Sequence, residues 1–344
     1  MTQSLAFWVE NSSEDAPSSV ALELHFNYWH LPSDKINYLD IGVLISGKNK
    51  QFDSINVYLP FRYNIKSYIS TLGDNVVESE ELISAVFNND VSNIKPIREC
   101  SAKYIVFSEQ KDSEGIVFFT NLSYGTSENR VLIEEHCEGD KVGTIIKFSN
   151  KIFNCSEEYK EKNWYLRFRY VLEKEDIDNI SRKYKSKDSL ITYYFEKSEV
   201  VDFRVNESRN LPKTIREKVA ICRNVHKVHF FLIRNESSEF KIGHTTYDRC
   251  RILEDKLWDT YLCDNKDTQV KTKMLIYHWK TKSDKKIEYF SAFARFSTRK
   301  VGLKEIIYVI LFIIILGVFS SLIATSLINI VDVLYRCIKV WRLG

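Results

Sequence analysis

The sequence predicts an α+β fold in which a β-rich, antiparallel, sandwich-like cytosolic region precedes a single C-terminal transmembrane helix. Three observations carry this prediction. Residues Ile306 to Val331 contain no charged side chain, and an apolar helix of about 20 residues is long enough to cross a bilayer. Several stretches before this segment alternate apolar and polar side chains, which is typical of half-buried strands. Tyr and Phe, at 19 and 21 residues, also favour strands.

Glu305 and Asp332 bracket the apolar segment, and we place the transmembrane helix at residues 305–332. The alternative is a buried helix of a soluble domain, but such helices are usually shorter and keep one polar face. Residues 333–344 mix basic and apolar side chains and predict an amphipathic tail in the headgroup layer. The basic residues that we expect at the membrane surface are Lys280, Lys282, Lys285, Lys286, Arg299, Lys300, Lys304, Arg336, Lys339 and Arg342.

Small and polar residues recur at every fourth position inside the segment, at Gly317, Ser321, Thr325 and Asn329. This spacing puts them on one face of a helix. In lipid, small side chains let two helices approach closely, and hydroxyl and amide groups can bond across the contact. We therefore predict self-association through this face. The two alternatives are hydroxyls that bond only their own backbone and a face that lines a water-filled pore.

The first residues form neither a basic n-region nor an apolar h-region, so no signal peptide is predicted. Residues 1–300 are therefore expected in the cytosol, with the chain's end at the far side of the membrane, as in a tail-anchored protein. The seven cysteines agree with reduced thiols, because their number is odd and no two lie close in the sequence. Glycosylation sequons such as those at Asn121 and Asn235 are the main counter-indication.

Composition suggests two regions before the membrane segment. We expect a flexible tail at 1–18, a β-rich domain at 19–172 and an α+β domain at 173–300, with a soft boundary in the highly charged stretch after residue 172. Acidic residues outnumber basic ones before this boundary, and the reverse holds after it. Basic residues close to a membrane attract anionic headgroups. They are interleaved with acidic residues here, so nucleic acid is not a predicted partner.

Hydrophobic periodicity gives a coarse map of the chain. Residues 164–172 alternate most cleanly and predict a half-buried strand, with Arg167 and Arg169 on its polar face. Helical patterns occur at 64–87 and 246–262, and a short helix is expected after Pro212. Further strands are expected at 19–29, 38–46, 52–59, 103–108, 115–121, 130–137, 142–149, 190–205 and 225–233, and residues 269–280 and 286–297 predict a hairpin.

No motif in the sequence predicts a metal ion or a cofactor. His226 and His229 are three positions apart in a predicted strand, so they point to opposite faces and cannot bind one ion together. Glu134 to Cys137 places a histidine next to a cysteine, but neighbours on a strand also face opposite ways, which predicts a buried thiol and an exposed imidazole. Nucleophile-elbow, phosphate-loop and dinucleotide motifs are absent from the sequence.

Two clusters combine aromatic side chains with histidine. One spans His25 to His30, and the other combines Trp258 with residues 277–279. Each could bind a ligand base by stacking, or could simply contribute to a hydrophobic core.

We therefore expect a membrane-attached binding or sensing protein rather than an enzyme. Its partners would be the lipid bilayer, further copies of the chain and an unidentified protein or small-molecule ligand. One alternative is a membrane-perturbing effector of a bacterial stress or antiviral defence system, which rests on analogy of architecture alone. The other is a membrane-attached hydrolase, which a buried carboxylate or a Cys–His pair in a polar pocket would favour.

Overall fold

The structure is a computed structural model of the chain. It describes residues 3–11, 20–31, 36–47, 50–98, 100–108, 115–125, 130–185, 196–221, 224–262, 273–282, 286–299 and 302–341.

Among these residues, ten strands form one large sheet. Most neighbours are antiparallel, as the sequence predicts, but β14 lies parallel to β2 and β11 lies parallel to β8. Strand β5 pairs with β11 beside this path. The order across the sheet is β16 (Arg249–Ile252), β17 (Met274–Lys282), β14 (Val225–Asn235), β2 (Ala21–Trp29), β3 (Asn37–Ser46), β11 (Asn163–Leu172), β8 (Ile116–Phe119), β7 (Ala102–Phe107) and β6 (Val91–Ile97), with β5 at Tyr68–Ile69.

Two smaller sheets complete the β structure of the described residues. The first has the order β1 (Ala6–Glu10), β4 (Ser54–Leu59), β10 (Lys141–Ser149) and β9 (Val131–Glu138). The second has the order β12 (Ser181–Lys185), β13 (Glu196–Val205), β18 (Phe290–Arg299) and β15 (Ser238–Gly243). The flexible tail predicted at 1–18 is wrong for residues 6–10, because β1 pairs with β4 and its apolar side chains are buried. Its other residues lie largely outside the described ranges.

The main core lies between one face of the large sheet and the two smaller sheets. Every second residue of β2 points into it, including Leu22, Leu24 and Phe26. Phe7 of β1 and Phe203 of β13 come from the smaller sheets, and both rings contact Phe26. The strand period of two thus separates the core side chains of β2 from the side chains on the opposite face. This packing of sheet on sheet agrees with the sandwich-like fold that the sequence predicts.

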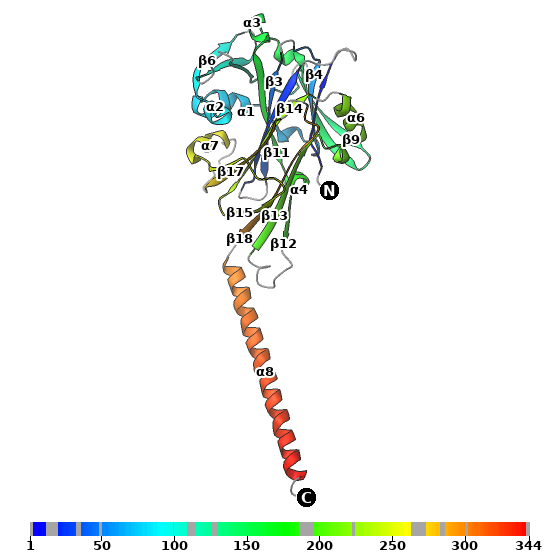
Figure 1. Ribbon diagram of the computed structural model, residues 1–344, viewed down its shortest axis with the longest axis vertical. Coiled ribbons are helices and arrows are strands. Elements are labelled where there is room, and N and C mark those ends of the chain that lie inside the picture. The colour runs from blue at the N-terminus through cyan, green and yellow to red at the C-terminus, as the bar shows by residue number, and fades with distance from the viewer. Residues whose placement is uncertain are drawn as a thin grey trace. The chain divides into compact units, whose positions relative to one another are not determined.

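Helices cover the opposite face of the large sheet and form a second core. They are α1 (Leu72–Val77), α2 (Glu80–Phe87) and α7 (Asp255–Leu262), which Figure 1 shows grouped on one side of the strands. Ser79 caps α2 by accepting a hydrogen bond from the backbone of Leu82. At the other end Asn88 takes the left-handed conformation and its N–H bonds Ser84.

This helical layer corrects the prediction for β11. Arg167 and Arg169, expected on a polar face, are 1% and 0% exposed. The helices α1 and α7 pack over this face of the strand. Tyr261 of α7 accepts a hydrogen bond from Arg167 Nε at 2.9 Å. Such a partner is needed because a buried charged group without hydrogen bonds is costly. Both faces of β11 are therefore covered, so it is a buried central strand rather than a half-buried one.

Apart from the long C-terminal helix, the remaining helical elements of the described residues are short. The helix expected after Pro212 is present as α6 (Lys213–Ile221), whose Ile215 and Val219 pack on Trp8 and Tyr58 of the first small sheet. The others are η1 (Ile65–Ser67), η2 (Asn150–Phe153), α3 (Glu157–Lys160), α4 (Lys174–Ile180) and η3 (Ser208–Asn210).

The predicted hairpin of 269–280 with 286–297 is wrong, because β17 and β18 belong to different sheets. Both edges of β17 are already bonded, one to β14 and the other to β16, so no edge is free for β18. The helix predicted at 246–262 is correct only in its second half. Its first half contains β16, whose residues extend the large sheet instead of forming a turn of helix.

The C-terminal helix α8 runs without a break from Leu303 to Trp341, so the predicted tail continues the same helix through most of its length. Its span Ile306–Ile338 is long and apolar enough to cross a membrane, and no residue in its most apolar stretch is buried. A core helix would be covered by other elements of the chain. The alternative of a buried core helix is therefore not supported.

Candidate functional site

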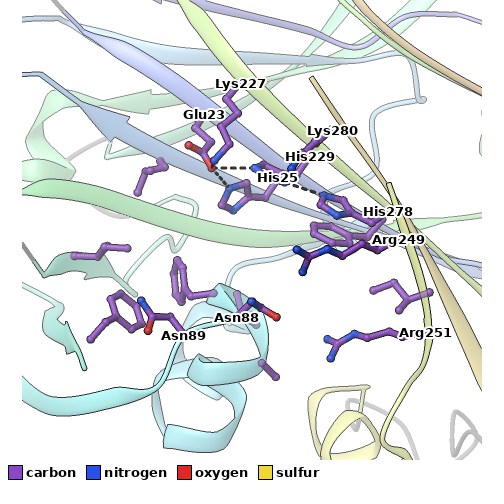
Figure 2. Close-up of a pocket in the computed structure, with 18 residues that line it drawn as sticks. Glu23, His25, Asn88, Asn89, Lys227, His229, Arg249, Arg251, His278 and Lys280 are labelled. Atoms are coloured by element: carbon purple, nitrogen blue, oxygen red, sulfur yellow. Dashed lines mark hydrogen bonds and ion pairs between the residues drawn. The ribbon is translucent and has the colours of Figure 1, made fainter. Parts of the chain in front are cut away.

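A pocket of about 430 Å³ lies between the large sheet and the end of α2, within the size range of small-molecule sites. Figure 2 shows its polar side chains. Its lining residues are Glu23, His25, Leu44, Ala85, Val86, Phe87, Asn88, Asn89, Phe107, Ile116, Lys227, His229, Phe231, Arg249, Arg251, Ile276, His278 and Lys280.

Strand periodicity explains why polar side chains collect here. On β2, Glu23 and His25 alternate with buried residues of the main core. On β14, Lys227 and His229 do the same, and the parallel register sets Lys227 beside Glu23 and His229 beside His25. The antiparallel neighbour β17 adds Lys280 opposite His229. One face of three adjacent strands thus builds the site.

The Glu23 carboxylate is the centre of this group. Its Oε1 atom lies 2.9 Å from His25 Nε2, 3.2 Å from His229 Nε2 and 2.9 Å from Lys227 Nζ, and Figure 2 shows these contacts. Burial alone would raise the pKa of Glu23, but the neighbouring His229, His25 and Lys227 outweigh it and hold the pKa well below its usual range. The carboxylate is therefore ionised at neutral pH.

His25 is fixed from its other side as well. Its Nδ1 lies 3.3 Å from Tyr165 Oη, which accepts a hydrogen bond from Arg167 at 3.0 Å. Burial lowers the pKa of His25 to about 4, although Glu23 opposes this shift. The imidazole is therefore neutral at physiological pH, with a lone pair available on one nitrogen.

His229 and His278 form a stacked pair with ring planes 9° apart. Nδ1 of His229 lies 2.9 Å from Nε2 of His278, and His278 in turn stacks on Phe231. Burial, followed by the neighbouring His229, lowers the pKa of His278 to about 4. Three imidazoles thus meet in one pocket, and the pKa values of His25 and His278 are well below neutrality.

Basic side chains surround the other side of the pocket. Arg249 and Arg251 occupy alternate positions of β16, opposite His278 and Ile276 of β17. Figure 2 shows both arginines reaching toward the end of α2 that carries Asn88. Glu23 is the one carboxylate among the lining residues that the structure describes. An excess of cationic groups therefore faces the space.

Gly42 keeps this arrangement sterically possible. It lies opposite His25 on β3, and a Cβ atom there would stand 2.0 Å from Tyr165 Oη. We expect Gly42→Ala to lower the free energy of unfolding by about 1–3 kcal/mol, as overpacking of a buried site usually does. Urea unfolding of the solubilised protein would measure this change.

Tyr165→Phe removes the Tyr165 hydroxyl, which is the atom nearest to a Cβ at Gly42. Combining it with Gly42→Ala in a double-mutant cycle tests the steric explanation. The double variant should lose less stability than the two single losses added together, because both changes act on one contact. Additive losses would contradict the steric explanation.

The structure places the predicted membrane-surface residues in different settings. Lys280 lines the pocket, and Lys286 donates a hydrogen bond to Asn224 at 2.9 Å. Arg299, Lys304 and Arg336 are exposed. Lys285, Lys300 and Arg342 lie outside the described residues, and the side chains of Lys282 and Lys339 do as well. Contact of these residues with lipid stays a prediction.

The predicted association face of α8 is fully exposed, with Gly317, Ser321, Thr325 and Asn329 on the helix surface. No atom outside the local backbone lies within 4 Å of a Cβ built at Gly317. Thr325 Oγ1 donates to the carbonyl of Ser321 in the same helix, at 2.9 Å. That bond matches the local alternative for this hydroxyl, and self-association stays a prediction.

The structure does not bring the members of the histidine, His–Cys and aromatic motifs of the sequence together in one site. His229 faces the pocket, whereas His226 is not among its lining residues. Cys137 is exposed and His136 is half-buried, contrary to the expected buried thiol. In the two aromatic clusters only His25 and His278 reach the pocket, and most of their aromatic rings belong to the cores.

Sequence reasoning missed the pocket as a unit. The available signal was polar residues two apart within otherwise apolar strands: Glu23 and His25 on β2, and Lys227 and His229 on β14. About 200 residues separate these strands along the chain, so their spacing alone did not predict that they are neighbours.

Comparisons with known proteins give little further information about this site. No protein-family model matches the chain, and no curated protein sequence matches it. Among solved structures, it is similar to the NMR structure of the folded domain of LppM from Mycobacterium tuberculosis. That match has 7% identity and a TM-score of 0.23, and it covers 86% of this chain and 98% of the LppM domain.

Proposed function

We propose that this chain is a membrane-anchored protein whose globular region binds a small phosphate-bearing ligand in the pocket. The observation that carries the proposal is its charge. Lys227, Lys280, Arg249 and Arg251 line the pocket against one carboxylate, and Lys227 already pairs with that carboxylate. A dianionic group would offset most of the remaining positive charge and accept bidentate bonds from the arginines, of which Arg251 also pairs with Glu254 at 3.5 Å.

The apolar part of the lining indicates what else the ligand carries. Phe231 and Ile276 line the pocket together with Val86 of α2. Binding sites of this size combine apolar walls with a few oriented polar groups. The side-chain amides of Asn88 and Asn89 add hydrogen-bonding groups at the opposite wall. An organic phosphate with a flat apolar portion, such as a nucleoside phosphate, fits both features.

Calorimetry of the full chain in detergent, with a chelator present, would test this proposal. The probes are nucleoside mono- and triphosphates, inositol phosphates and inorganic phosphate, which separate nucleotides from lipid headgroups and from the bare anion. Arg249→Gln with Arg251→Gln should weaken binding at least about 100-fold, because each charge-assisted bond contributes about 1.5–3 kcal/mol.

The matched control removes two exposed arginines outside the pocket, Arg209→Gln with Arg216→Gln, and should leave the affinity unchanged. Equal losses in both double variants would indicate general electrostatic attraction rather than a pocket. No binding of any probe would rule out the phosphate ligand.

A hydrolase is the second candidate, and one observation favours it. Glu23, an ionised carboxylate, is held against two imidazoles inside a polar pocket, which is a common arrangement in acid–base catalysis. Turnover of a bound phosphate ester, lost in Glu23→Gln, would support this function. Binding without turnover would favour the sensing function.

The anchor and its sidedness belong to the same proposal. Helix α8 is long and apolar enough to span a bilayer, and we propose that the globular region lies on its cytosolic side. The free thiols of Cys137 and Cys250 support this, because reducing compartments keep cysteines unpaired. Thiol labelling of sealed membranes would report the side on which the exposed Cys137 lies.

A further inference from the structure

Glu23, His25 and His229 are the one group of three metal-ligating residues that the described part of the chain brings together, with one ligand atom of each within 4.8 Å of the others. The oxygen of Glu23 lies 2.9 Å and 3.2 Å from the two imidazole nitrogens. Two ligand atoms about 2.1 Å from a tetrahedral zinc ion lie about 3.4 Å apart. We propose that these three side chains bind a divalent transition metal, with zinc as the best match.

The state of His229 is an independent reason for this inference. Its Nε2 atom is buried and makes no hydrogen bond among the described residues, and the Glu23 oxygen 3.2 Å away is an ion-pair neighbour only when the imidazole is protonated. Burying a polar atom without a partner costs free energy. A cation between this nitrogen and the carboxylate would satisfy both atoms.

The surrounding groups match those that support metal-binding histidines. Such imidazoles usually hold their other ring nitrogen in a hydrogen bond, which fixes the tautomer. Nδ1 of His229 lies 2.9 Å from His278 Nε2, and Nδ1 of His25 lies 3.3 Å from Tyr165 Oη. If one metal ion binds the Nε2 atoms of both histidines, each ring carries its proton on Nδ1. His278 Nε2 and Tyr165 Oη are then in place to accept the two Nδ1–H hydrogen bonds.

The donor set also indicates which cation would bind. Two imidazoles and one carboxylate suit zinc and its first-row neighbours, whereas magnesium and calcium prefer oxygen ligands. Lys227 Nζ occupies the same Glu23 oxygen at 2.9 Å, so the metal would displace this ammonium group. Three protein ligands leave one position for water or an acidic ligand. The metal site goes beyond the phosphate proposal and does not depend on it.

Calorimetry of the chelator-stripped full chain, in detergent and phosphate-free buffer, would test the site directly. We expect one zinc ion per chain and no magnesium binding. His25→Gln and His229→Gln should each weaken zinc binding at least 100-fold, and Tyr165→Phe about 10-fold, as supporting partners do. His226→Gln, on the same strand as His229 but outside the pocket, should change nothing.

Cobalt absorption of the unsubstituted chain tests the site without relying on the folding of any variant. Intense visible bands without a thiolate charge-transfer band would support a tetrahedral site of nitrogen and oxygen ligands. A thiolate band, an octahedral spectrum, or zinc affinity unaffected by both histidine variants would overturn the proposal, as would the absence of zinc binding. Zinc that binds while every phosphate probe fails would refute only the phosphate ligand.

Discussion

Replacing Arg169 with methionine is expected to lower the free energy of unfolding by about 3–5 kcal/mol. Arg169 Nε and Nη2 donate to the Asp40 carboxylate at 2.6 Å and 3.2 Å, and both side chains are 0% exposed. Trp29 and Tyr261 donate to the same carboxylate, each at 2.7 Å. The substitution would leave a buried carboxylate without its counter-charge. Denaturant unfolding followed by tryptophan fluorescence would measure the loss.

Arg62→Met provides the matched control for that measurement. Arg62 pairs with Glu175 at 3.6 Å, and the two side chains are 77% and 78% exposed. Surface pairs of this kind contribute less than about 1 kcal/mol. Losses of similar size in the two variants would show that burial does not make the Asp40–Arg169 pair special.

Ending the chain after Gly302 is expected to convert it from a membrane protein into a soluble one. Residues 306–331 contain 18 Leu, Ile, Val and Phe side chains, and their insertion is favoured by about 5–10 kcal/mol in total. Such a preference leaves almost none of the full chain in solution. Fractionation with alkaline carbonate would measure it, with the full chain in the membrane pellet and the shortened chain in the supernatant.

A second pair of variants separates helix insertion from surface attachment. Leu316→Arg places a charge at the centre of the span at a cost of about 2.5–3.5 kcal/mol, whereas Leu316→Phe keeps the helix apolar. Membrane integration should weaken in the first variant and persist in the second. A shortened chain that still resists carbonate extraction would contradict anchoring by α8.

The sequence determined α8 and most of the strands by itself. A helix makes all of its backbone hydrogen bonds within one segment, so a charge-free run of this length can be recognised as a spanning helix without knowledge of its neighbours. The alternation in β2 and β14 likewise indicates which side chains share a face, because the strand period is a local property. Both strands lie where the pattern predicts them, at 21–29 and 225–235.

Only the tertiary structure decided which elements pack against each strand face. Alternation in β11 predicts one polar face, yet α7 supplies Tyr261 to cover it and β3 supplies Asp40 to pair with Arg169. Residues of β1 offered too short a pattern to be recognised as a strand, and pairing with β4 orders them. Both outcomes depend on side chains far away in the sequence, which a local pattern does not specify.

The pocket shows the same division most clearly. The strand period of two puts Glu23 and His25 on one face of β2, and Lys227 and His229 on one face of β14. Their meeting depends on β14 pairing with β2 in parallel at one register, because a shift of one residue would turn Lys227 and His229 toward the core. Packing of the buried residues that alternate with them sets that register. The hydrophobic core therefore decides where the polar chemistry of this protein lies.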